Sequence, residues 1–491
     1  MFLSLKSMVF SADYNRDTLW RSIKATISIV LIFSVVFISY SAVSSSHYQW
    51  SCPHCDQYPD PFPAAIPGPT ASPEPTNISH IVFGIGASSH TWHQRRGYSE
   101  LWWRPGEMKG HVWLDEEPKR GSWPDTCPPY RVSADTSRYG ARASASRIAR
   151  IVAESFAVGM ENVRWFVMGD DDTVFFIENL VAVLGKYDHD QMWYIGAPSE
   201  SVEQNLQHSY GTAFGGGGFA ISYPAAAELA KVIDGCLDRY IHFYGSDERI
   251  RACLSELGVP LTREPGFHQV DLRGDAYGML AAHPIAPLVS LHHLDDVHRV
   301  IPSRSTQMDA IRTLMDASRQ DPARTLQQTF CYNREQGHNW SVSVSWGYTV
   351  QLYHWVVPPH DLEVPLQTFR TWRSSQNGPF VFNTRPFTVS HNCEPMLFFL
   401  DRVSERRKAQ QVSVTEYTRH ESSIDKGCDR AGFASASQVR SIRVVAPKMD
   451  PYEWQKAPRR HCCEARSKVS NEKIIDVWIR HCYPGEITSP P

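Results

Sequence analysis

Three consecutive carboxylates, Asp170, Asp171 and Asp172, directly follow the apolar run 164–168 (RWFVM) and Gly169. Adjacent like charges repel one another and resist burial, and a divalent cation with oxygen ligands removes that conflict. Ligands of open α/β sheets bind beyond the carboxyl ends of the strands. The triad therefore favours a site for a metal ion and a nucleotide diphosphate, although an isolated acidic triad is typical of a helix cap.

A glycine run, 215–218, lies within the apolar frame YGTAFGGGGFAIS. Glycine lets the backbone approach a ligand without obstruction by a Cβ atom. We therefore expect Gly216 and Gly217 to line the cofactor site. The alternative is a flexible hinge, but the flanking Phe214 and Phe219 favour a packed turn.

An adjacent acidic pair, Asp247 and Glu248, follows a Gly-Ser turn in YGSDER. Carboxylates in such a turn suit a general base. The alternative is the N-terminal cap of a helix over 248–257, and both functions are compatible. Cys236 and Cys253 bracket the segment and are placed to staple it.

Histidines provide a further set of ligands beside the acids. A neutral imidazole is a good third protein ligand for a manganese-type ion. The candidates are His268 in PGFHQVD, His283, and the pair His292-His293 in SLHHLDD.

The elements that position these groups alternate between strand and helix. Apolar runs predict strands at 80–87, 111–115, 164–168 and 191–196, and helical spacing predicts helices at 143–158 and 177–187. This alternation indicates an α/β fold with a mixed sheet flanked by helices. After about residue 305, period-two patterns occur at 340–353, 439–445 and 474–479. Six of the 11 cysteines lie there, so we expect a β-rich, disulfide-tied domain.

The composition of the 491 residues excludes several classes of protein. The net charge is −3, which gives no global electrostatic reason to coat nucleic acid. Hydrophobic residues make up 42% and aromatics 12%, which excludes wholesale disorder. The 11 cysteines suggest an oxidising compartment, and their odd number leaves at least one thiol without a partner in the chain.

Residues 25–43 are free of charge and long enough to approach the thickness of a bilayer core. Basic residues precede this segment and none follows until Arg95, so the positive-inside rule puts the tail 1–24 in the cytoplasm. We expect an uncleaved signal-anchor rather than a cleaved signal peptide. The Pro-rich segment 44–79 is then predicted to be an extended stem. The sequons at Asn77 and Asn339 lie on the luminal side, which indicates a glycoprotein.

The ordered set RWFVMGDDDTVFF, YIGAPS, FGGGGFAIS, the acidic pair and GFH resembles the Fringe-like glycosyltransferases of the β-1,3-glycosyltransferase family. The resemblance is closest to the plant Fringe-related proteins described as a domain of unknown function. It covers about 80–305, which implies a GT-A-like domain there and leaves 306–491 as a β-rich, Cys-containing accessory domain.

The resemblance also implies roles for individual residues. Asp170, Asp171 and Asp172 match the DxD motif, of which Asp170 and Asp172 would bind the metal. His268 matches the third metal ligand, with His292-His293 as a competing pair. Asp247 or Glu248 matches the catalytic carboxylate, and the Asp-Glu pair replaces the family's Asp-Asp. Asp115 and Arg150 match residues near the nucleotide.

The function implied by the resemblance is a Golgi type II membrane enzyme. It would use Mn²⁺ or another divalent cation and transfer a sugar from a UDP-sugar to a glycan or glycoconjugate hydroxyl, with inversion and a β-1,3 linkage. The main alternative is a non-catalytic sugar-binding or scaffold protein on the same fold. A metal-dependent phosphohydrolase and a structural interaction protein are the other classes. Donor sugar, acceptor and oligomeric state stay open.

Overall fold

The computed structural model describes residues 9–44, 74–333, 339–387, 393–406, 411–421, 428, 432–468 and 471–488. The chain forms two compact units, 1–74 and 75–491. In the first, helix α1 (Val9–Ser44) contains an exposed stretch, Ile23–Tyr40, that is long and apolar enough to cross a membrane, with a mean hydropathy of 2.1. It overlaps the predicted anchor 25–43. Most of the predicted stem, with Cys52 and Cys55, lies outside the described residues.

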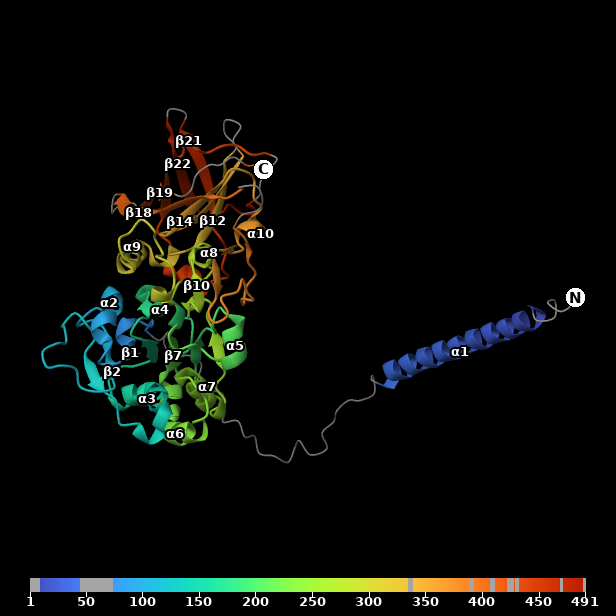
Figure 1. Cartoon of the computed structure of the whole chain (residues 1–491), viewed down its shortest axis with the longest axis horizontal. Helices are drawn as coiled ribbons and strands as arrows, with labels where there is room; N and C mark the ends of the chain where they lie inside the picture. The colour runs from blue at the N-terminus through green and yellow to red at the C-terminus, as the bar shows by residue number, and fades with distance from the viewer. Residues whose placement is uncertain are drawn as a thin grey trace, which may run out of the picture. The chain divides into compact units, whose positions relative to one another are not determined.

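The centre of the N-terminal half of the second unit is a seven-stranded mixed sheet, as the sequence predicts (Figure 1). The strand order is β3-β2-β1-β4-β7-β6-β8, and β7 runs antiparallel to both of its neighbours. The bounds of its strands are β1 Ile81–Gly86, β2 Lys109–Leu114, β3 Tyr130–Val132, β4 Trp165–Asp170, β6 Tyr194–Gly196, β7 Phe219–Ser222 and β8 Leu261–Arg263.

Side chains of the central strands alternate between two hydrophobic cores, because successive residues of a strand face opposite sides. In β4, Trp165 and Val167 belong to one core, and Phe166 and Met168 belong to the other. The first core is covered by α2 (Trp92–Trp102), α4 (Ile177–Leu184) and α9 (Gln307–Gln320). The second is covered by α3 (Ala143–Ala157), α6 (Tyr223–Arg239) and α7 (Ser246–Glu256).

A small sheet, with the order β5-β11-β9, joins distant parts of the chain beside the end of β4. Its strands are β5 Val174–Phe175, β9 Phe267–His268 and β11 Ser290–Leu291. The parallel pairing of β9 with β11 aligns His268 with Leu291. This register decides which histidine can face the acidic triad. The shorter helices of this half are α5 (Val202–His208) and α8 (Tyr277–Ala281).

The C-terminal half is built on an eight-stranded sheet with the order β12-β13-β14-β18-β19-β20-β22-β21 (Figure 1). Its strands are β12 Gln328–Asn333, β13 Trp340–Ser345, β14 Thr349–Tyr353, β18 Met396–Arg406, β19 Val412–Arg419, β20 Ser441–Pro447, β21 Cys462–Lys468 and β22 Asn471–Arg480. The predicted alternation over 340–353 is two strands rather than one, because Gly347, with a φ of +77°, makes a turn between them.

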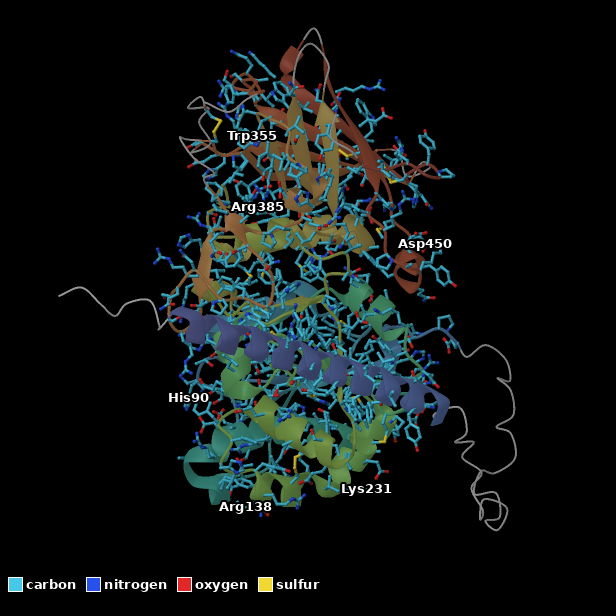
Figure 2. The ribbon with its side chains drawn as sticks, turned by 90° about the vertical axis from the view of Figure 1, so that its right-hand side faces the viewer. His90, Arg138, Lys231, Trp355, Arg385 and Asp450 are labelled. Carbon is cyan, nitrogen blue, oxygen red and sulfur yellow. A yellow bond between two sulfur atoms is a disulfide. The ribbon has the colours of Figure 1, made fainter. Side chains whose placement is uncertain are left out.

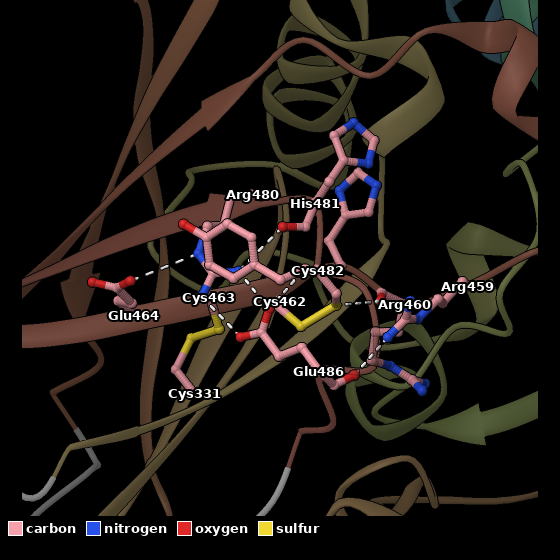
Figure 3. Close-up of a disulfide and its surroundings, with 12 residues drawn as sticks. Cys331, Arg459, Arg460, Cys462, Cys463, Glu464, Arg480, His481, Cys482 and Glu486 are labelled. Carbon is pink, nitrogen blue, oxygen red and sulfur yellow. Dashed lines mark hydrogen bonds and ion pairs between the residues drawn. A yellow bond between two sulfur atoms is a disulfide. The ribbon is translucent and has the colours of Figure 1, made fainter.

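Disulfides tie this sheet, as its cysteine content predicts. Cys331–Cys463 joins β12 to β21, the two ends of the strand order, and Cys462–Cys482 lies beside it (Figure 3). Cys393–Cys428 closes a loop of the same half. In the first half, Cys236–Cys253 staples α6 to α7. Among the described residues Cys127 is free and buried.

We expect removal of Cys331–Cys463, by alanine at both positions, to lower the free energy of unfolding by about 2–5 kcal/mol. The bond spans 132 residues, so its loss frees a long loop in the unfolded chain. The urea midpoint measures the change, with Cys127→Ala as a control that removes a cysteine but no cross-link. An unchanged midpoint in the double variant would refute this expectation.

The two halves lie within one compact unit, and strand pairing joins them in addition to the covalent chain. Strand β10 (Leu272–Gly274) of the first half pairs antiparallel with β16 (Phe369–Thr371) of the second. Nearby lie α10 (Pro359–Leu362), β15 (Leu366–Gln367) and β17 (Arg385–Pro386). The domain boundary at 305/306 stays a prediction.

Candidate active site

The acidic triad forms a tight loop at the carboxyl end of β4. Asp170 is the last residue of the strand, and its N–H donates to Thr173 Oγ1 over 2.8 Å. The Thr173 hydroxyl donates to the carbonyl oxygen of Gly216 over 2.7 Å. Asp171 and Asp172 are buried. A single threonine thus fixes the loop against the glycine run and keeps the three carboxylates together.

His292, directly after β11, faces two of these carboxylates. Its Nε2 lies 3.0 Å from Asp172 Oδ1 and 3.8 Å from Asp170 Oδ2. Its Nδ1 lies 3.2 Å from the carbonyl oxygen of Gln269, so an N–H there holds the ring with Nε2 toward the acids. Ligand atoms of Asp170, Asp172 and His292 all lie within 4.8 Å of one another. These three side chains are therefore placed to share one cation.

The chemistry of this group fits a hard divalent cation. Two carboxylates and one imidazole suit a manganese-type ion. Asp172 Oδ1 is buried and is paired with His292 Nε2 at 3.0 Å, and no further hydrogen bond reaches it within the described part of the chain. A cation at this position would satisfy that oxygen.

Charges around the triad compensate one another. Arg95 Nη1, from α2, lies 2.9 Å from Asp171 Oδ1 and 3.3 Å from Asp172 Oδ2. Burial acts to raise the pKa of Asp172, but the charge of His292 outweighs it and holds that pKa below its usual range. Burial acts to lower the pKa of His292, but the charge of Asp172 raises it to about 9. Desolvation raises the pKa of Asp170 to about 7. A bound cation would replace the His292 proton.

His268, which the sequence analysis assigns as the third metal ligand, lies in a different cluster. Its Nδ1 is 3.1 Å from Glu200 Oε1, and its Nε2 is 3.0 Å from His283 Nε2. All three side chains are buried. His292 takes its place beside the acids, because the β9–β11 register carries the chain past Leu291 to the triad.

The glycine run packs against the site rather than standing free. A Cβ atom on Gly216 would lie 2.0 Å from His292 Cε1, and one on Gly217 would lie 3.0 Å from the backbone nitrogen of Gln269. The Gly217 N–H also donates to Gln269 Oε1 over 2.6 Å. Gly216 therefore lets the His292 ring approach the acidic loop closely, and Gly217 lets the loop lie against the backbone of Gln269.

We expect Gly216→Ala to displace His292, to weaken divalent-cation affinity about 10-fold or more, and to cost about 1–3 kcal/mol of stability. Titration calorimetry with Mn²⁺ and a melting curve measure the two effects. Gly215→Ala is the matched control, because the nearest atom to its new methyl group is Asp247 Cβ at 3.8 Å. Equal cation affinity in the two variants would contradict the role of Gly216.

The acidic pair divides into two different environments. Glu248 caps α7, since its Oε2 accepts from the Gly245 N–H over 2.9 Å, and it also lies 3.2 Å from His208 Nδ1. Asp247 lines a cavity of about 20 Å³ together with Asp170. Such a space holds about one water-sized group. Burial raises the pKa of Asp247, and its place on this cavity beside Asp170 makes it the better-placed general base of the two.

Asp115 and Arg150 are placed differently. Asp115 follows β2 and accepts from Ser88 Oγ and the Ser89 N–H, each over 2.8 Å, at the carboxyl ends of the strands. Burial acts to raise its pKa, but these hydrogen bonds hold it below its usual range. Arg150 instead pairs with Asp234 of α6 and lies 3.8 Å from Glu154.

Two arginines that the sequence analysis did not select lie at this edge. Arg147, one helical turn before Arg150, donates to the carbonyl oxygens of Ala87 and Trp113, each over 2.9 Å. Arg95 pairs with the acidic triad. Arg95 lies in the segment 89–103 (SHTWHQRRGYSELWW), where no local pattern distinguishes it from Arg96.

Comparison with known proteins finds similarity to enzymes that transfer sugars. The chain is 34% identical over 124 residues to bovine β-1,3-N-acetylglucosaminyltransferase lunatic fringe, covering 21% of this chain and 31% of that protein. It is 34% identical over 141 residues to mouse β-1,3-glucosyltransferase, covering 28% and 27%. The chain thus spans about a third or less of these relatives. Mouse xyloside xylosyltransferase 1, at 9% identity and a TM-score of 0.25, matches 37% of this chain and 81% of that one, too weakly to bear on the fold.

Over part of its length the chain is thus similar to β-1,3-glycosyltransferases, one of which is a fringe protein. A family model matches residues 204–463, more than half of the sequence. The chain belongs to this family, DUF604, which is described as a protein of unknown function.

Proposed function

We propose that the chain transfers a sugar from a UDP-sugar to a glycan or glycoconjugate hydroxyl, with inversion and with a divalent cation such as Mn²⁺. The observation that carries this proposal is the group of Asp170, Asp172 and His292, with Asp247 beside it. The β-1,3 linkage is proposed from the names of the relatives. We further propose a GT-A-like head over 80–305, held in the Golgi lumen by α1.

The donor has a candidate cavity of about 540 Å³ beyond the carboxyl ends of β1 and β2. This volume suits a nucleotide-sized ligand. Aromatic, basic and acidic side chains line it, among them Trp92, Arg96, Lys119 and His90, which Figure 2 labels. Asp115 lies next to its lining residue Glu116.

The protein's residues supply positioning and charge at the departing diphosphate. Asp170, Asp172 and His292 would hold the cation, which when bound neutralises the charge that develops on UDP. Arg95, beside Asp171, is a second positive group at the same edge. These groups would act on the leaving group, the UDP diphosphate.

Asp247 acts on the acceptor side as the general base. The acceptor oxygen forms a bond to the anomeric carbon while the bond from that carbon to the diphosphate oxygen breaks, and UDP leaves with the electron pair. The hydroxyl proton passes to Asp247. A single displacement of this kind inverts the anomeric centre.

A panel of UDP-sugars tests the proposal with the full-length chain, by UDP release with and without Mn²⁺. We expect release with at least one donor, dependent on Mn²⁺ and lost in Asp172→Asn. Donor binding without release from any donor or acceptor would favour the sugar-binding or scaffold alternative. Neither binding nor release across the panel would reject the proposal.

A further inference from the structure

A segment of the C-terminal half, residues 366–387, lies on the first half close to the candidate active site. Strand β16 within it pairs with β10, and Phe380 forms a bridge with Ser201. At its far end Arg385 donates from Nε to the carbonyl oxygen of Val364 over 3.0 Å and packs on the Tyr353 ring of the C-terminal sheet (Figure 2). The segment is thus held by both halves.

This segment adds Trp372 to a stack of side chains that ends at the candidate metal site. The Trp372 ring lies parallel to His293, with centroids 4.4 Å apart and an interplanar angle of 7°. His293 packs on His292, with centroids 3.8 Å apart. The Arg273 guanidinium lies over Trp372, with its Cζ atom 3.9 Å from the ring centroid. The order is Arg273, Trp372, His293, His292.

His293 and Arg273 both lie over the Trp372 ring, so the ring is engaged within the protein rather than presented to a sugar. Trp372 instead contacts His293, whose backbone is in the left-handed region with a φ of +50°. His293 Nδ1 also lies 3.2 Å from Asp271 Oδ1. The ring of Trp372 and the carboxylate of Asp271 together hold His293 in place behind His292.

We infer that Trp372 is a positioning residue for the metal site, so that the C-terminal half completes the active site of the first half. The inference rests on the proposed function for its metal ion. Through His293, Trp372 limits the rotation of His292 and keeps its Nε2 facing Asp172. Removing an outer partner of a metal-bound histidine lowers metal affinity about 10–100-fold in other proteins.

Calorimetric titration of the full-length chain with Mn²⁺ tests this inference. We expect Trp372→Ala to weaken affinity about 10-fold or more, and Trp372→Phe, which keeps a flat ring, to stay within about 3-fold of wild type. A double-mutant cycle isolates the route, since Trp372→Ala should add little once His293 is alanine. Tyr452→Ala, at an exposed aromatic of the same half, is the control.

The outcomes separate the two claims. If wild type binds Mn²⁺ and Trp372→Ala binds it equally well, the positioning role is rejected and the proposed function stands. If wild type binds no divalent cation, the proposed function itself fails. A similar loss in Trp372→Phe and Trp372→Ala, or a full effect of Trp372→Ala on the His293→Ala background, would also reject the role.

Discussion

Replacing Asp247 by asparagine is expected to lower kcat by about 10²-fold or more while leaving the affinity for UDP-sugar and Mn²⁺ almost unchanged. Asp247 lines the cavity that it shares with Asp170, and burial raises its pKa. Asparagine keeps the shape of the side chain and an oxygen that can accept from the N–H of Gly215 or Glu248. Initial rates at saturating donor, with donor affinity measured separately, distinguish lost proton transfer from lost binding.

Glu248→Gln is the matched control for Asp247→Asn. The Glu248 carboxylate caps α7 and pairs with His208. We therefore expect the amide introduced by Glu248→Gln to lower stability more than it lowers turnover. A melting curve and the same rate measurement separate the two effects. If Glu248→Gln is inactive and Asp247→Asn turns over normally, Glu248 is the base.

Asp172→Asn is expected to weaken divalent-cation affinity about 100-fold or more and to abolish cation-dependent turnover. Loss of a direct ligand should exceed the 10–100-fold loss seen for outer partners. The change also leaves the buried His292 without its close counter-charge, so we expect lower stability as well. Calorimetry with Mn²⁺ in the presence of UDP measures the affinity.

Asp171→Asn provides the comparison within the same triad. Asp171 contacts Arg95 and is not among the three residues whose ligand atoms converge. We expect a much smaller loss of cation affinity there. Equal losses at both positions would show that the triad acts through its total charge rather than through two defined ligands.

The sequence predicts the strand before the three carboxylates and their place at the sheet edge well, because both depend on local order. An apolar strand followed by three carboxylates places Asp170 at the carboxyl end of β4 wherever that strand lies in the sheet. Which histidine lies beside the carboxylates depends on long-range pairing. The β9–β11 register sends His268 to Glu200 and brings His292 to Asp172, and no spacing along the chain reveals that register.

The position of each arginine around helix α3 explains why Arg147, and not the predicted Arg150, reaches the strand ends. Arg147 and Arg150 lie three residues apart, on neighbouring parts of one helix surface. Arg147 reaches the ends of β1 and β2, and Arg150 turns to Asp234 of α6. Which of them faces the strand ends depends on how α3 packs across the sheet. Trp372 is harder still to predict, because its contact with His293 joins the two halves of the chain.

The most direct test is the position of the metal ion. A crystal of the full-length chain grown with Mn²⁺ and UDP, measured near the manganese absorption edge, would reveal it by anomalous scattering. We expect the strongest anomalous peak among Asp170, Asp172 and His292, next to the UDP diphosphate. A peak at His268 and His283, or UDP bound with no metal at the triad, would contradict the proposed site.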